Sequence, residues 1–118
     1  MDELGEQLAG WGKVLRLETR GRTSGRPVEV AIGYIDEPDG TVSVAAGSPN
    51  ADWARNLEAD PHCRVTVGEV EWPAAVAETL TAMEAQRVVR DLILKYGTPA
   101  ERLGRGPAFR LRRVVEPG

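Results

Sequence analysis

The chain has 118 residues, a formal net charge of -3 and a single cysteine. This length suits one compact domain, and the mildly acidic balance gives no general attraction for nucleic acid. No segment approaches the ~20 apolar residues of a membrane span. The lone Cys63 excludes an internal disulfide and fits a reducing compartment. We therefore expect a single cytoplasmic domain over residues 1–118, with no membrane or nucleic-acid partner.

Apolar residues that alternate with polar ones predict a chain made mostly of short strands. Strands are expected at 13–19, 27–36, 41–46, 62–67, 70–80 and 108–115, and helices at 2–11, 51–59 and 81–96. The first three strands are expected to form an antiparallel meander. Turns this short cannot hold parallel crossovers, so the pattern indicates an α+β, mainly β domain. Its expected fold is a six-stranded antiparallel barrel, closed or nearly closed, with three short helices at its openings.

Four local features refine this expectation. Pro73 lies inside the fifth strand and predicts an edge or a β-bulge, because proline cannot donate a ladder hydrogen bond. The segment Thr81–Glu84 has the spacing of a capping box at a helix start. Asn50 is the expected N-cap of the preceding helix. Val115 is expected on the inward face of the last strand.

The connection between the first two strands is rich in arginine. Residues 20–27 read Arg-Gly-Arg-Thr-Ser-Gly-Arg-Pro, with three guanidinium groups in eight residues. Arginine is a planar fork of donors that suits phosphate and carboxylate, and glycine lets backbone approach a ligand closely. The segment is either a solvated hairpin tip or a cradle for an anionic ligand. Because the tip is expected to be exposed, Arg22 has no expected role in folding.

The helix expected at 51–59 is entered through the small residues Gly47–Asn50. The free N–H groups of a helix N-terminus can receive an anion. Asp60 and Pro61 end this helix, because the residue before a proline avoids helical backbone angles.

Taken together, these two stretches resemble the deazaflavin (coenzyme F420)-dependent nitroreductase and quinone reductase family. The resemblance rests on Gly21–Pro27 and on Ala51–Pro61 leading into Arg64–Gly68, and it covers roughly residues 13–95. It implies a split β-barrel like those of the FMN-binding and pyridoxamine-phosphate oxidase proteins. It also implies an oxidoreductase that binds coenzyme F420 and passes a hydride to a quinone, a nitro compound or another conjugated acceptor.

The resemblance also assigns roles to individual residues. Arg22, Ser24 and Gly25 stand where the family grips the coenzyme phosphate, and the arginines on either side add charge. Trp53 and Asn56 stand where the coenzyme tail is supported, and residues 45–48 where backbone lines the deazaflavin ring. The expected cofactor-binding residues are Arg20, Arg22, Thr23, Ser24, Gly25, Arg26, Ala45, Ala46, Gly47, Ser48, Trp53 and Asn56.

Two alternatives remain open at this stage. Val28 follows the proline where the family usually has an arginine, which leaves FMN or haem as the ligand of the same barrel. A barrel that binds a small molecule without catalysis is the other alternative. No acid–base constellation is evident in the sequence, but in hydride transfer the cofactor carries the chemistry and the protein orients it.

The remaining candidates are isolated residues. Tyr34 and Tyr96 are the residues expected to reach a substrate, although core packing explains them equally well. His62 lacks neighbours at ligand spacing, so we expect no metal site, and Cys63 is expected to be a buried, unreactive thiol. An uncovered apolar face that includes Trp72 and Val70 predicts a homodimer.

Overall fold

The computed structural model describes residues 14–97, 103 and 105–115, which form seven strands and two helices. The helix expected at 2–11 lies outside these residues. No helix in the described ranges combines the length and the apolar character needed to cross a membrane. The elements are β1 (Leu15–Arg20), β2 (Pro27–Ile32), β3 (Ile35–Asp36), β4 (Val42–Ala45), α2 (Asp52–Ala59), β5 (His62–Val67), β6 (Val70–Thr79), α3 (Ala82–Tyr96) and β7 (Ala108–Arg113).

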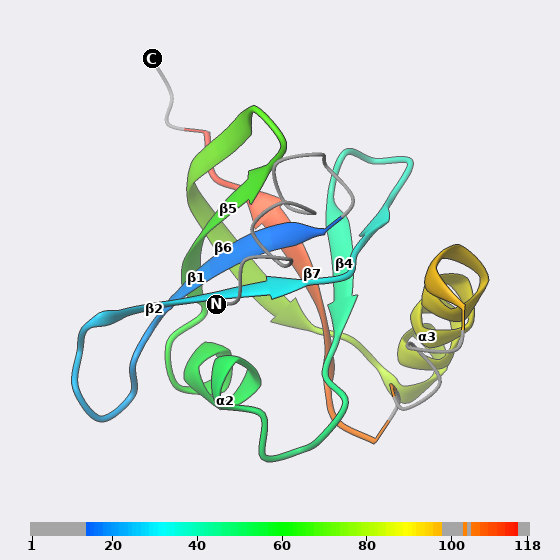
Figure 1. Cartoon of the computed structure of the whole chain (residues 1–118), viewed down its shortest axis with the longest axis horizontal. Coiled ribbons are helices and arrows are strands. Elements are labelled where there is room, and N and C mark those ends of the chain that lie inside the picture. Colours follow the sequence, from blue (N-terminus) through cyan, green and yellow to red (C-terminus); the bar gives the residue numbers. More distant parts are fainter. Residues whose placement is uncertain (1–13, 98–102, 104, 116–118) are drawn as a thin grey trace.

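All the strands belong to one antiparallel sheet that curls into a half-barrel (Figure 1). Its strand order is β2-β1-β5-β6-β7-β4-β3, so β2 and β3 stand at opposite ends. Only Gly33 and Tyr34 separate these two strands along the chain. Since two residues span at most about 7 Å, the sheet has to bend until its ends approach each other. The expected mainly β, split-barrel-like architecture is therefore confirmed.

Two expectations about the strands are wrong: the number of strands, and the antiparallel meander of the first three. The predicted strand 27–36 divides at Gly33–Tyr34, and its two parts pair with different strands, β1 and β4. The division has a cause in α3. The backbone N–H of Tyr34 donates to the Tyr96 hydroxyl at 3.2 Å, and the Lys95 amine donates to the Tyr34 carbonyl at 2.8 Å. Side chains of α3 thus take the backbone groups that a continuous strand would use in its ladder.

Two apolar clusters hold the domain together. The first fills the half-barrel with side chains of alternate strand positions and of α2; its large, fully buried members include Leu15, Leu17, Val44, Val65, Phe109 and Leu111. The second joins α3 to the sheet and is made by Ala45, Val88, Leu92 and Ala108. The inward position expected for Val115 is wrong: β7 ends at Arg113, and Val115 is 74% exposed.

The predicted irregularity at Pro73 is a β-bulge. Val65 pairs with Trp72 and Cys63 pairs with Ala75, so two residues of β6 oppose one residue of β5. Pro73 therefore sits where no ladder hydrogen bond is required of it.

The capping box at the start of α3 is half realised. The Thr81 hydroxyl accepts the Glu84 backbone N–H at 3.3 Å, as expected. The Glu84 carboxylate instead binds Arg110 of β7 at 2.9 Å, because a strand guanidinium competes for it. Helix α3 is thereby attached to the sheet at its first turn.

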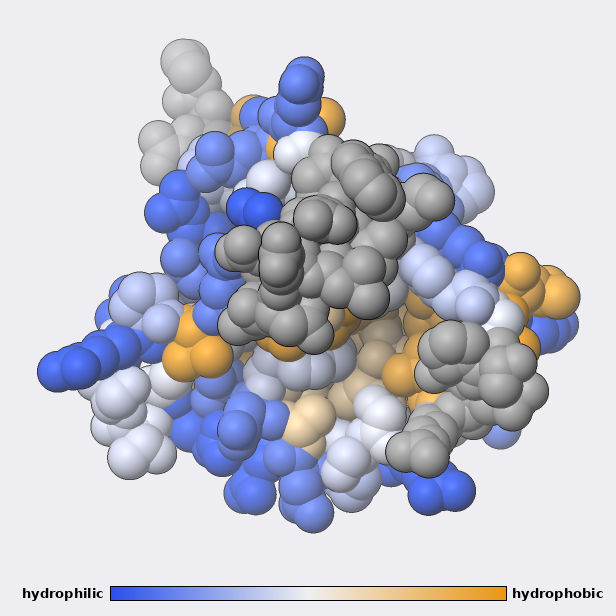
Figure 2. Space-filling view, in the orientation of Figure 1, coloured by the Kyte–Doolittle hydropathy of each residue, from blue (hydrophilic) through white to orange (hydrophobic). Residues whose placement is uncertain are grey.

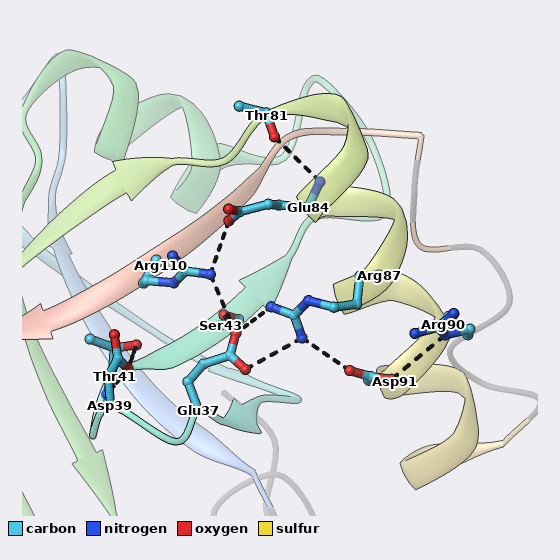
Figure 3. A network of polar contacts seen from close by, with 10 residues as sticks. All are labelled: Glu37, Asp39, Thr41, Ser43, Thr81, Glu84, Arg87, Arg90, Asp91 and Arg110. Atoms are coloured by element: carbon cyan, nitrogen blue, oxygen red, sulfur yellow. Dashed lines mark hydrogen bonds and ion pairs between the residues drawn. The ribbon is translucent and has the colours of Figure 1, made fainter.

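A buried carboxylate continues this attachment along α3 (Figure 3). The Glu37 side chain is only 7% exposed and lies 2.6 Å from Arg87 and 3.5 Å from Arg110, and it accepts the Ser43 hydroxyl at 2.8 Å. Arg87 also binds Asp91 one turn further along the helix at 3.1 Å. Burial alone would raise the pKa of Glu37, but the hydrogen bonds and charges of its partners hold that pKa below its usual value.

Glu37→Gln should therefore lower the free energy of unfolding by about 2 kcal/mol at neutral pH, since two arginines lose their shared counter-charge. A carboxylate whose pKa is lowered by folding stabilises the folded protein at pH values above the ordinary glutamate pKa of about 4.3. This stabilisation disappears as the pH falls below that value. The difference in the free energy of unfolding between wild type and variant should thus become smaller in acid. Urea unfolding at several pH values measures it.

The matched control is Glu78→Gln, because Glu78 pairs with Arg112 across an exposed 3.6 Å contact. It should change stability by less than about 0.5 kcal/mol. Equal losses in both variants would show that burial of the Glu37 network contributes nothing.

Candidate functional site

The arginine-rich connection between β1 and β2 folds onto itself. The Gly21 N–H donates to the Arg26 carbonyl and the Gly25 N–H to the Gly21 carbonyl, both at 2.8 Å, and the Arg26 N–H donates to the Ser24 hydroxyl at 3.2 Å. Gly25 has φ +72°, a backbone conformation that disfavours other residues, and no atom lies within 4 Å of the place of a Cβ. The tip is therefore open to a ligand. Hydrophilic side chains cover this end of the molecule, at the left of Figure 2.

Arg22 does not extend into solvent but binds helix α2. Its Nη1 atom donates to the Asn56 side-chain oxygen at 2.8 Å, and its backbone N–H donates to the same oxygen at 3.2 Å. Its Nη2 atom lies 3.2 Å from an Asp52 carboxylate oxygen. The Asn56 amide nitrogen in turn donates to the Thr19 hydroxyl at 3.1 Å, and both Asn56 and Thr19 are 2% exposed. The two motifs that the sequence singled out therefore meet in one hydrogen-bonded junction.

These contacts were not expected for an exposed turn, and they lead us to predict a role for Arg22 in folding. The junction also distributes the charge of the turn. Arg22 is paired with Asp52, and Arg20 lies 3.8 Å from Asp60. Among the described residues, Arg26 has no carboxylate within 4.0 Å. Arg26 is therefore the arginine of the turn without an acidic partner in the described part of the chain.

The entry to α2 differs from the prediction. The N-cap residue is Ala51, which makes no side-chain cap, so the expected cap at Asn50 is wrong. Ser48 organises the entry instead: its hydroxyl accepts the Asn50 N–H at 3.1 Å and its carbonyl accepts the Ala51 N–H at 3.2 Å. The first N–H groups of α2 consequently lack a side-chain partner from the cap.

The expected ring-lining segment, residues 45–48, runs from the core to the surface. Ala45 and Ala46 are 7% and 1% exposed, whereas Gly47 is exposed. The Ala46 N–H donates to the Pro107 carbonyl at 2.9 Å. A Cβ on Gly106 would clash with the Ser48 carbonyl oxygen, so only glycine allows the two backbones to approach this closely. The segment is thus held against residues 106–107.

Trp53 is half-buried and packs edge-on against Phe109, with the ring centroids 5.9 Å apart. Its indole therefore closes the end of the half-barrel that α2 covers.

The two tyrosines lie together, at the contact of α3 with the β2–β3 connection. Tyr34 is 5% exposed, and the Lys95 amine sits 3.7 Å from its ring centre. Burial raises the pKa of Tyr34 and of Tyr96 and lowers that of Lys95. The structure thus brings Tyr34 and Tyr96 together, while their contact with a substrate stays a prediction. Sequence reasoning missed Lys95, whose place in the last turn of a helix looks like ordinary dipole compensation.

A cleft of about 440 Å³ opens beside the turn. Arg20, Gly25 and Pro27 line one side, and Cys63 and Arg64 are among the residues that line the other. Neither residues 45–48 nor Trp53 reaches this cleft. The predicted cofactor residues therefore do not all line this cleft.

The other candidate side chains have structural surroundings. Burial, with a smaller contribution from the charge of Asp60, raises the pKa of the Cys63 thiol to about 12. His62 is exposed and lies 2.9 Å from an Asp60 carboxylate oxygen. Within the described residues, no three His, Cys, Asp or Glu side chains gather as metal ligands would.

The curled half-barrel resembles several solved structures. An F420-H2 dependent reductase (FDR-A) is 23% identical, with 85% of this chain and 94% of that chain covered and a TM-score of 0.70. The heme storage protein HutZ from Vibrio cholerae is 21% identical; the match covers 94% of this chain and 88% of HutZ, with a TM-score of 0.70. A protein described as a domain-swapped dimer is 22% identical; the match covers 93% of this chain and 95% of that chain, with a TM-score of 0.69. At these identities the similarity establishes the fold.

The fold and the turn thus define a split-barrel protein with a candidate site for an anionic ligand. The sequence matches the F420H2-dependent quinone reductase family over residues 2–105, and the chain belongs to this family. No curated protein matches the chain. The family confirms the resemblance seen in the sequence: the protein is an oxidoreductase whose cofactor is coenzyme F420.

Arg22→Ala should lower the free energy of unfolding by about 1–2 kcal/mol, because the buried Asn56 oxygen loses its charged donor. The loss is only partial, since the backbone N–H of residue 22 still reaches that oxygen. Urea unfolding measures the change, and a double-mutant cycle with Asn56→Ala isolates the coupling.

Arg26→Ala in the same turn is the control and should stay within about 0.5 kcal/mol of wild type. The junction would lose its assigned role if the two arginine variants unfolded at the same urea concentration.

The Cys63 thiol should be nearly inert in the native protein. At pH 8 a buried thiol with a pKa of about 12 holds far less thiolate than an unfolded one with a pKa of about 8.5. Labelling with a chromogenic disulfide should therefore be on the order of a thousandfold slower in native protein than in urea. Complete native labelling within minutes would contradict this assignment.

Proposed function

We propose that this oxidoreductase passes the hydride of reduced coenzyme F420 to a quinone, a nitro compound or another conjugated acceptor. The observation that carries the proposal is the Arg22–Asn56 junction, with bonds of 2.8 and 3.2 Å. It gives a physical reason for the two family motifs to occur together, because each holds the other in place. When bound, coenzyme F420 supplies the hydride, and the protein supplies its position and a site shielded from water.

The turn fits the phosphate of the coenzyme. Arg26 lacks an acidic partner among the described residues, and Gly25 leaves open space at the tip. We assign the phosphate contact to Arg26, with Thr23 and Ser24 as hydroxyl donors. Arg20 adds charge from a side chain that is 68% exposed. Guanidinium groups bind phosphate through paired, charge-assisted hydrogen bonds, which favours Arg26 over a lysine in this role.

Arg22 and Asn56 are assigned a positioning role. The Asn56 amide is 2% exposed and already binds Arg22 and Thr19, so it acts through the turn and not on the coenzyme tail. Trp53, which is half-buried, supports the same end of the barrel. Of the segment 45–48, the exposed Gly47 and the partly exposed Ser48 are the residues we assign to the deazaflavin ring.

Homodimerisation and a cytoplasmic location remain predictions. Val70 is 60% exposed and supports an apolar contact between copies, whereas Trp72 packs partly against the core of the half-barrel. The cytoplasmic location rests on the single, buried Cys63.

Titration of the purified protein with oxidised coenzyme F420, FMN and haem tests the proposal. Quenching of deazaflavin fluorescence should saturate, and the reduced coenzyme should be oxidised when menadione or a nitroaromatic is added. Arg26→Ala should weaken coenzyme binding about ten- to hundredfold, since a charge-assisted hydrogen bond contributes roughly 1.5–3 kcal/mol. Raising the salt concentration should weaken wild-type binding as well.

Arg112→Ala is the control, because Arg112 is an exposed arginine of β7 that pairs with Glu78. It should bind the coenzyme as wild type does. Tight binding of FMN or haem, with no response to coenzyme F420, would favour the alternative ligands and defeat the proposal. If no ligand binds, a barrel without this catalytic role becomes the better description.

A further inference from the structure

A second concavity lies along α3, on a part of the molecule that carries none of the assigned phosphate residues. Its volume is about 690 Å³, within the range of pockets that hold small organic ligands. One wall is α3, and the other is made by residues 79–80 and 106–108. Apolar side chains gather over α3 at the right of Figure 2. We call this concavity the α3 groove.

The groove exists because the apolar stripe of α3 is wider than the sheet can cover. Val88 and Leu92, both 0% exposed, face the core. Neighbouring positions from Ala82 to Leu94, including Val89 and Ile93, follow one another every three or four residues and line the groove instead. Between Ala82 and Leu94 the helix rises about 18 Å, so this wall of the groove is long.

The lining favours an uncharged ligand. Among the described residues that line the groove, Arg90 alone carries a charge, and it lies 3.8 Å from Asp91. Leu80, Pro107 and Ala108 continue the apolar surface on the opposite wall. Within this described lining, an anion such as the coenzyme phosphate finds no cluster of donors.

The groove shares a wall with the segment assigned to the deazaflavin ring. Pro107 lines the groove, and its carbonyl accepts the Ala46 N–H at 2.9 Å. Gly106 also lines the groove, and a Cβ added to it would clash with the Ser48 carbonyl. The α3 groove and the assigned ring site are therefore neighbours that share this segment.

We propose that the α3 groove holds the hydrocarbon chain of a quinone acceptor while the quinone head lies at the ring site. The inference rests on the proposed function, which supplies the acceptor, and adds a determinant of its specificity. Burial of apolar surface along α3 would then favour quinones that carry a chain over the same quinones without one.

The test compares decylubiquinone with the same quinone ring lacking the decyl chain. With coenzyme bound, decylubiquinone should shift the methyl NMR signals of Val89, Ile93 and Leu94 saturably, whereas the chainless ring should not. Leu94→Glu should raise KM for decylubiquinone about tenfold, because roughly one buried apolar contact is lost. It should leave turnover of the chainless ring unchanged.

Met83→Glu is the matched control. Met83 and Leu94 are apolar residues of α3 that are 82% and 78% exposed, but only Leu94 lines the groove. Met83→Glu should leave both KM values at the wild-type level. Equal effects of the two variants, or decyl-dependent shifts outside the groove, would overturn the proposal.

Two other outcomes separate the possible failures. Decyl-dependent methyl shifts without oxidation of reduced coenzyme by either quinone would count against the proposed function and leave the groove assignment standing. The wild-type protein could also have a solution mass of twice 12.8 kDa. If Leu94→Glu halved that mass and Met83→Glu did not, the groove would be a contact between copies, and the assignment would be overturned.

Discussion

The arrangement of the candidate site depends on the buried amide of Asn56. A polar group that is 2% exposed has to be hydrogen-bonded, and Asn56 meets this requirement with Arg22 on one side and Thr19 on the other. One side chain therefore ties α2 to both β1 and the turn after it. This constraint leaves the tip of the turn free to carry Arg26 and Gly25 toward a ligand, while the base of the turn is fixed to the barrel.

A second constraint sets the position of α3. The Glu37 carboxylate brings together two guanidinium groups, one from α3 and one from β7, and is itself almost fully buried. Lys95 and Tyr96 then hold the other end of the helix at the break between β2 and β3. Helix α3 is consequently held at both ends against the sheet, and the apolar stripe that the sheet leaves uncovered becomes the wall of a groove.

Much of the fold followed from local patterns, as particular residues show. Leu15 and Leu17 alternate with polar residues and point into the core, as a half-buried strand requires. Pro73 marked a bulge because its ring excludes a ladder bond. The break at Gly33–Tyr34 gave no such signal. Its cause lies in Lys95 and Tyr96, more than sixty residues away along the chain.

Residue types at short spacing predicted most of the strands, the arginine-rich turn and the family, but not the division of the strand expected at 27–36. What each arginine contacts depends on how distant segments are arranged in the folded chain. Arg22 and Arg26 look alike in the turn, yet one binds a buried asparagine and the other has no acidic partner in the described part of the chain. The difference arises because hydrogen bonding and charge pairing depend on which distant groups the fold brings within about 3 Å.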